Sequence, residues 1–194
     1  MSSSVESAVR ALEQRTYDEW PPALRALFDG SALSSKVGFT ASLITSDAAG
    51  HLRTSLLGIG ELYVPDSRTI AFALWPSSRA ARSLAGSNDS GDVSRGHRRV
   101  QAALAFVHDG AFHQVQLAVE ALPSEADAAG CGLALFVASI EAGEAQQVGY
   151  ARLTCGITFE LPNDVRERQA VLARWEKQIG ALREAVNRRS ASGG

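Results

Sequence analysis

Two serines and two arginines within six residues form the segment best suited to bind an anion. Ser77 and Ser78 precede a short helical pattern, in which Arg79 and Arg82 lie on one side of the helix. Either serine can cap this helix, whose first-turn N–H groups lack intrahelical partners and attract negative charge. A guanidinium can bind a phosphate through two parallel hydrogen bonds. The segment is a candidate phosphate site; the alternative is a capped helix with its arginines in solvent.

A second candidate is the segment 52–57, which reads Leu-Arg-Thr-Ser-Leu-Leu. Side chains alternate along a strand, so Arg53 and Ser55 project to one face and Thr54 and Leu56 to the other. One interpretation is a strand that lies along a ligand. The other is an edge strand with an arginine on the surface.

A third candidate lies on the predicted strand 111–122, where Gln114 and Gln116 share one face. A polar row of this kind either faces a ligand or faces solvent. Trp75 also belongs among the candidates, because it directly precedes the serine and arginine segment. Most tryptophans are core or interface residues, so its position beside the candidate phosphate site is what distinguishes it.

Other reactive side chains give weaker signals. His108 and His113 flank a predicted Asp-Gly hairpin, where solvated turn histidines are expected in preference to a metal pair. Cys131 and Cys155 are expected to be free thiols in a reducing compartment. The sequence has no dinucleotide-binding glycine motif after a strand, no phosphate-binding Walker loop and no serine nucleophile elbow. No catalytic acid or base is therefore predicted.

The predicted elements are those of a mainly β protein with flanking helices. Hydrophobic spacing predicts helices over 4–15, after Pro21-Pro22 and over 164–186, and a capping box predicts another over 124–142. Alternation and short apolar runs predict strands at 37–45, 51–64, 69–74, 98–108, 111–122 and 148–161. About six antiparallel strands joined by turns favour a closed or partly closed barrel.

Length and composition predict one domain over residues 1–194. Its expected parts are N-terminal helices at 1–30, a barrel at 36–161 with a loop at 87–96, a C-terminal helix at 163–187 and a frayed tail at 188–194. The net charge of −2 gives no sequence-wide field for nucleic acid. The sequence shows neither a signal peptide nor an apolar run of transmembrane length, so a cytoplasmic protein without membrane contact is expected.

The order of these elements and the three candidate segments resemble the FMN-binding split barrel of the pyridoxamine-phosphate-oxidase-like superfamily, over roughly residues 25–161. The resemblance implies that Arg53, Arg79 and Arg82 bind the FMN phosphate beside Ser77 and Ser78. It implies that residues 54–56 contact the flavin ring and that Gln114 faces the ring. The chain departs from the pattern at Ala80, where the family carries Lys, and at His113, where it carries Arg.

The resemblance implies an FMN-dependent oxidoreductase that acts on a small-molecule substrate as a homodimer, with the cofactor site at the interface. The C-terminal Trp…Arg-Leu segment of true pyridoxamine phosphate oxidases is absent, so the vitamin B6 enzyme is not expected. One alternative is an F420-dependent oxidoreductase, for which Arg95, Arg98 and Arg99 would line a basic groove. Another is a non-enzymatic haem- or ligand-binding split barrel.

Overall fold

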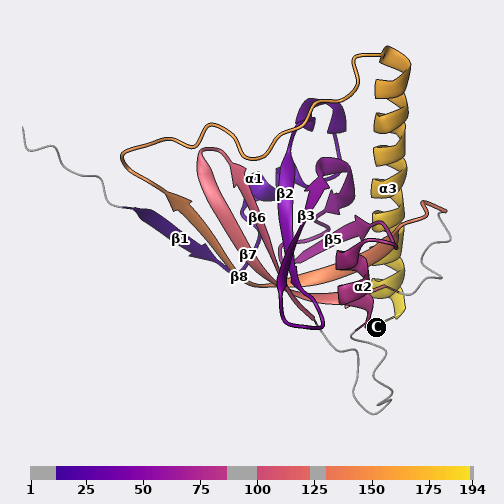
Figure 1. The fold of residues 1–194 in the computed structure, drawn as a ribbon, viewed down its shortest axis with the longest axis horizontal. Coiled ribbons are helices and arrows are strands. Elements are labelled where there is room, and N and C mark those ends of the chain that lie inside the picture. Colours follow the sequence, from indigo (N-terminus) through magenta and orange to yellow (C-terminus); the bar gives the residue numbers. More distant parts are fainter. Residues whose placement is uncertain (1–11, 87–99, 123–129, 193–194) are drawn as a thin grey trace, which may run out of the picture.

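A single curled antiparallel sheet forms the centre of the fold in the computed structural model, which describes residues 12–86, 100–122 and 130–192 (Figure 1). Its strands run in the order β3-β2-β6-β7-β8-β5-β4, and β1 pairs with β8. The strands are β1 Glu13–Tyr17, β2 Thr40–Ser46, β3 Leu52–Gly58, β4 Leu62–Tyr63, β5 Thr69–Leu74, β6 Val100–His108, β7 Ala111–Ala121 and β8 Ala134–Gln147. The predicted split barrel with flanking helices is confirmed, with eight strands where about six were predicted.

Short helical segments and one long helix flank the sheet. The α-helices are α1 Pro22–Leu27, α2 Arg79–Ala85 and α3 Val165–Ser192, and the 3-10 turns are η1 Leu33–Lys36 and η2 Ile59–Glu61. The C-terminal helix was predicted to end near residue 187, but it continues through the expected tail to Ser192. The predicted loop 87–96 lies outside the described residues, as do Arg95, Arg98 and Arg99.

The longest strand, β8, occupies a segment for which a helix was predicted. The helix prediction over 124–142 is wrong from residue 130 onward, because 130–133 are irregular and β8 begins at Ala134; residues 123–129 lie outside the described part. Residues 135–138 are all buried. Strand β8 is also paired along both edges, with β7 on one side and with β5 and β1 on the other. A continuous apolar run buried on both faces has no alternation to distinguish it from a helix.

Two further predictions fail at the ends of the barrel. Residues 13–17 form β1, which pairs with residues 143–147 of β8, so the helix predicted over 4–15 is wrong for its described end. Residues 148–161 alternate in sequence but form an irregular, mostly exposed segment instead of a strand. Its residue 156 passes over Val107 of β6, and its residue 159 lies beside Gly58.

The hairpin between β6 and β7 forms where it was predicted. Asp109 and Gly110 both have positive φ, 49° and 74°, as a two-residue type I′ turn requires. Pairing continues from His108 and Ala111 at the turn to Val100 and Val119 at the far end. This register sends Gln114 and Gln116 to the exposed face of the sheet and Val115 to the core.

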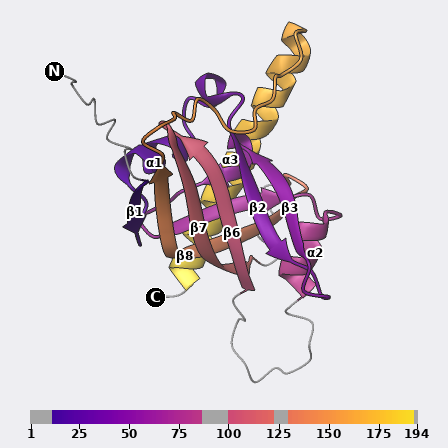
Figure 2. The same ribbon diagram turned by 60° about the vertical axis from the view of Figure 1, so that its left-hand side comes forward.

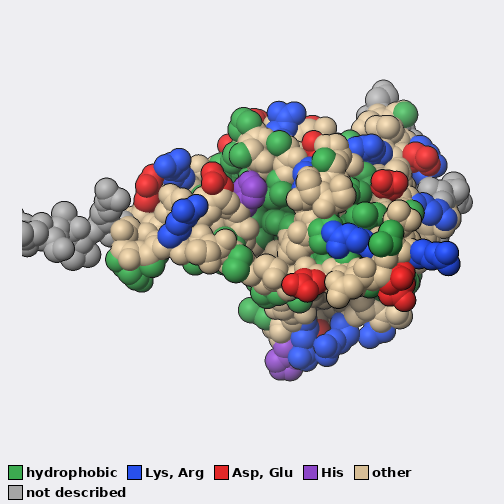
Figure 3. Space-filling model, turned by 90° about the horizontal axis from the view of Figure 1, so that it is seen from above, with side chains coloured by type: hydrophobic (Ala, Val, Ile, Leu, Met, Phe, Trp, Pro, Cys, Tyr) green, Lys and Arg blue, Asp and Glu red, His purple; other side chains and the backbone are tan. Residues whose placement is uncertain are grey.

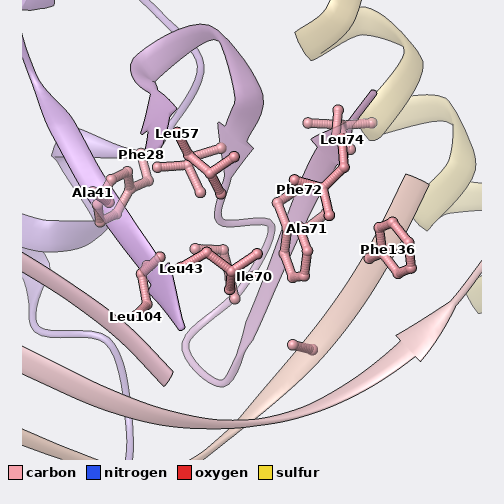
Figure 4. Close-up of a cluster of buried hydrophobic side chains, with 14 of the residues drawn as sticks. Phe28, Ala41, Leu43, Leu57, Ile70, Ala71, Phe72, Leu74, Leu104 and Phe136 are labelled. Atoms are coloured by element: carbon pink, nitrogen blue, oxygen red, sulfur yellow. The ribbon is translucent and has the colours of Figure 1, made fainter. Parts of the chain in front are cut away.

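The core lies inside the curl of the sheet and holds α3 against η2. Figure 4 shows Leu43, Ile70, Phe72, Leu104 and Phe136 pointing into it from different strands. On α3, the apolar stripe that predicts this helix is Leu172, Trp175, Ile179, Leu182 and Val186; the last four are buried, and Leu172 is partly buried against the core. The helix passes so close to η2 that no side chain fits at Gly60.

Candidate functional site

The junction between β5 and α2 has the geometry predicted for it. Ser78 is the cap, since its Oγ accepts a hydrogen bond from the Ala81 N–H at 3.1 Å. The Arg82 guanidinium turns back and donates to the Ser77 carbonyl oxygen at 2.7 Å. Among the described residues, no hydrogen bond or ion pair engages the exposed Arg79 side chain. Arg79 is therefore the cation of this junction that is available to an anion.

The side chains around Arg79 define the rest of the junction. Trp75 is 56% exposed, so its ring is available to a ligand rather than used in the core. Ala80 is buried and packs with Ala81 and Leu84 on the inner face of α2. At position 80 this chain therefore uses the side chain for packing, where the resembling family carries a Lys.

On β3, Arg53 is held by a carboxylate of the β2–β3 turn. Its Nε donates to Asp47 Oδ2 at 3.0 Å. The backbone N–H groups of His51 and Ala49, together with this guanidinium, hold the pKa of Asp47 below its usual value. Thr54 and Leu56 are exposed on the outer face, and Ser55 is half-buried on the inner one. Arg53 thus retains only its terminal nitrogens for a ligand.

The fold brings two of the three predicted segments together. Helix α2 contacts β2, β7 and β3, so the helix that carries Arg79 and Arg82 lies beside the strand that carries residues 53–56 (Figure 2). Gln114 is not part of this corner. It ends a cross-strand row that runs from Leu56 through Ser42 and Ala105, three strands away from β3 and at about 14 Å.

The outer face that carries this row has small side chains near its centre. Ser42, Ala103 and Ala105 are only partly exposed there. Beyond them, Gln114 and Gln116 line a hollow of about 400 Å³ together with β1 and β8. The hollow is also lined by three carboxylates, Asp18, Glu141 and Glu144, so it does not attract an anion.

A buried histidine lies at the open end of the barrel, next to the hairpin. His113 is 7% exposed and stacks on Phe106, with ring centroids 5.0 Å apart. Burial lowers the pKa of His113, as does the nearby His108, while a hydrogen bond to the His108 backbone acts in the opposite direction. The Tyr17 hydroxyl lies 3.3 Å from His113 Nδ1. The expectation of two solvated turn histidines is thus wrong for His113.

The pairing of Tyr17 with His113 was not foreseen, because residues 4–15 were interpreted as a helix. Strand β1 places Tyr17 opposite Gly143, whose missing side chain leaves room for the phenol ring. Burial raises the pKa of Tyr17, so the phenol is uncharged at neutral pH. The only signal in the sequence was that position 113 lies on the same face of its strand as the apolar Val115.

Charge and metal-binding groups are dispersed over the described surface. Figure 3 shows Lys and Arg interspersed with Asp and Glu at the upper end, around a central area of hydrophobic side chains. Within the described ranges, no group of three His, Cys, Asp or Glu residues is placed to hold a metal ion, and Cys131 and Cys155 are not in a disulfide. None of the helices in these ranges combines the length and apolar character that crossing a bilayer needs.

Comparisons with known proteins find similarity in structure and not in sequence. No family model and no curated protein matches the chain. A proposed pyridoxamine 5'-phosphate oxidase from Lactobacillus delbrueckii is 15% identical, with a TM-score of 0.46 over 66% of this chain and 94% of that chain. An F420 reductase is 11% identical, with a TM-score of 0.43 over 64% and 98%. An FMN-binding protein from Syntrophomonas wolfei is 12% identical, with a TM-score of 0.41 over 62% and 86%.

The fold defines the class of protein. A curled antiparallel sheet of eight strands, with α2 beside β3 and α3 packed against η2, is a split β-barrel.

Proposed function

We propose that this protein binds FMN at the corner between β3 and α2 and uses it as a redox cofactor for a small-molecule substrate. The observation that carries the proposal is the contact between α2, which carries Arg79 and Arg82, and β3, which carries residues 53–56. Residues 57–76 separate the two segments in the sequence, and the family resemblance assigns both segments to one cofactor site. Their meeting at one corner supports a shared ligand.

The residues at this corner fit a phosphate in part. Arg79 has a free guanidinium, and the first-turn N–H groups of α2 lack intrahelical partners except where Ser78 caps them. Arg82 and Arg53 add positive charge, although each already donates one hydrogen bond within the chain. The phosphate of a bound FMN would therefore rely mainly on Arg79.

The ring of the cofactor would extend along β3. Thr54, Ser55 and Leu56 would contact it from the strand, and the exposed Trp75 would cover it from the junction. A bound flavin supplies the redox chemistry, while the protein orients the ring and the substrate and limits the access of water. The redox chemistry of a flavin requires no acid or base from the described residues of this corner.

Gln114 fits the same proposal only in a dimer. In one chain it lies three strands from β3, on the same outer face. Two copies that pack their outer faces about a two-fold axis would bring Gln114 of one chain toward β3 of the other. The small side chains of Ser42, Ala103 and Ala105 would allow close approach of the two sheets. We therefore propose a homodimer with the cofactor site at its interface.

The proposal is tested by an absorption spectrum of the purified protein followed by titration with FMN, FAD and F420. Flavin absorption, or saturable binding of FMN, is the expected result. Binding of F420 alone would assign the chain to the deazaflavin alternative. A Soret band without flavin binding would favour the haem-binding alternative, and binding of none of these compounds would refute the proposal.

A further inference from the structure

A pocket of about 270 Å³ lies at the end of β3 opposite the corner with α2. The last residues of β3 and the first residue of β2 form its floor, and η2, α3 and residues 157–159 form its walls. Between Arg53 and Gly58 the strand rises by about 17 Å, so this pocket is separate from the candidate phosphate site. Leu56 and Leu57, the last residues of the candidate segment 52–57, line it, but the residues that make its other walls belong to none of the sequence motifs.

The floor of the pocket contains a buried hydroxyl that has no partner. Thr40 is 8% exposed, and its Oγ1 makes no hydrogen bond within the described residues. Buried polar groups are almost always hydrogen-bonded, because leaving one unpaired is costly. A ligand in the pocket would supply the partner that the chain itself does not.

A carboxyl group lies beside this hydroxyl. Glu61 Oε2 accepts a hydrogen bond from the Gly58 N–H at 2.8 Å, and Gly58 is the residue directly opposite Thr40 across the sheet. Burial raises the pKa of Glu61, while the bond from Gly58 and the positive charge of Arg174 oppose that shift. The second carboxyl oxygen has no hydrogen bond among the described residues and is available as an acceptor.

The absence of a side chain at Gly58 keeps the floor open. Its φ of −85° suits any residue, so the backbone does not require glycine. A Cβ there would lie 3.6 Å from Phe159 Cζ and 3.9 Å from Glu61 Oε2, at ordinary contact distances. A larger side chain at this position would therefore fill the pocket without forcing the backbone to move.

The walls favour a flat, partly apolar ligand. Phe159 and Trp175 meet edge to face, with ring centroids 6.0 Å apart. Leu56 and Ile157 line the same pocket and remain 54% and 56% exposed. An apolar cavity of about 150 Å³ takes one benzene molecule, so this pocket has room for one or two rings.

We propose that this pocket binds a small planar cyclic amide, one that carries a ring N–H next to a carbonyl group. The Thr40 hydroxyl donates to the carbonyl oxygen, the Glu61 carboxylate accepts from the ring N–H, and the rings lie against Phe159 and Trp175. Arg174 lines the same pocket, and its positive charge acts on the Glu61 carboxyl group. Binding at this pocket does not require a flavin at the α2 corner.

The test is calorimetric titration of the full chain with 2-quinolinone, a two-ring cyclic amide, and with N-methyl-2-quinolinone, which lacks the N–H. The wild-type protein should bind 2-quinolinone about tenfold more tightly than the N-methyl compound, because one hydrogen bond is lost. Equal affinities for the two compounds, or no binding of 2-quinolinone, would overturn the proposal.

Two variants and a matched control locate the binding. Thr40→Val should weaken 2-quinolinone about tenfold, and Gly58→Val should abolish its binding. Thr45 is the control, since its Oγ1 is also buried and unpaired on β2 but does not line the pocket. Both threonine variants should melt at or above the wild-type temperature, because each removes an unpaired hydroxyl. If Thr40→Val binds as well as Thr45→Val, the assignment is wrong.

A titration at saturating FMN separates two sources of the same chemistry, since a flavin ring also has a cyclic-amide edge. Unchanged affinity for 2-quinolinone assigns the pocket to a separate ligand. Competition assigns it to the ring of the flavin.

Discussion

Gly60 and Trp175 fix the position of α3 against the barrel. A Cβ built at Gly60 would lie 2.1 Å from Trp175 Cγ, in a region where both residues are buried. The contact joins η2 to the helix, and the same tryptophan forms one wall of the pocket at the end of β3. A single missing side chain therefore sets both the helix position and the shape of that pocket.

We expect Gly60→Ala to lower the free energy of unfolding by about 1–3 kcal/mol, the usual cost of overpacking a core. Gly180 on α3 is the control, because nothing lies within 4 Å of a Cβ there. Gly180→Ala should raise the stability by about 0.5–1 kcal/mol through helix propensity. Urea unfolding of both variants checks this, and a neutral Gly60→Ala would show that α3 sits further from η2.

The buried His113 predicts loss of stability in mild acid. Because its folded pKa is lowered below 6.5, the unfolded chain binds the proton more readily, and stability falls as the pH drops below 6.5. The melting temperature of the wild type should therefore decrease between pH 8 and pH 5.5 by more than that of His113→Phe, which keeps an aromatic ring against Phe106. An equal decrease in both proteins would remove His113 as the cause.

At the scale of elements, α2 depends on Ser78, the residue that caps its N-terminus. The helix has seven residues, so its cap is a large part of what holds its N-terminal turn. Ser78→Ala should lower the free energy of unfolding by about 1 kcal/mol. Ser77→Ala is the matched control, since Ser77 contributes only its carbonyl oxygen, to Arg82. Chemical denaturation of the two variants tests this prediction. Equal losses of unfolding free energy in both would show that Ser78 is not the cap.

The elements that the sequence predicts well are those whose pattern follows from local chemistry. The β6–β7 hairpin follows from Asp109-Gly110, and the stripe of α3 from apolar residues three and four apart. The wrong predictions concern segments whose structure depends on the neighbouring strands, which the local sequence does not reveal. Residues 135–138 form a strand because β5 and β7 flank them, and the alternating segment 148–161 stays irregular because it pairs with no strand of the sheet.

The same distinction explains the candidate site. A cap at Ser77 or Ser78 and the exposure of Arg79 and Arg82 follow from helix geometry; the structure has Ser78 as the cap and both arginines exposed. The partners of Arg53 and Arg82 do not follow from it, because Asp47 and the Ser77 carbonyl oxygen are reached only by particular side-chain conformations. The pocket with Thr40 and Glu61 was missed because its walls come from four separate parts of the chain.

At the scale of the whole molecule, the outer face of the sheet predicts self-association. If two copies pack through this face, Ala105→Arg should convert a dimer into a monomer, because it places a charge at the centre of the interface. Ala173→Arg, on the exposed side of α3, should leave the dimer intact. Sedimentation velocity distinguishes the two, and a monomeric wild type or a dimeric Ala105→Arg would contradict the proposed assembly.

The most direct test of the proposed function compares FMN with riboflavin, which has the same ring without the phosphate, in calorimetric titrations of the wild type and Arg79→Ala. If the phosphate binds at the corner between β3 and α2, FMN should bind the wild type about 10- to 100-fold more tightly than riboflavin. Arg79→Ala should lose most of that difference and keep its affinity for riboflavin. Equal binding of the two compounds by the wild type, or an undiminished preference for FMN in Arg79→Ala, would contradict the assignment of the phosphate to this corner.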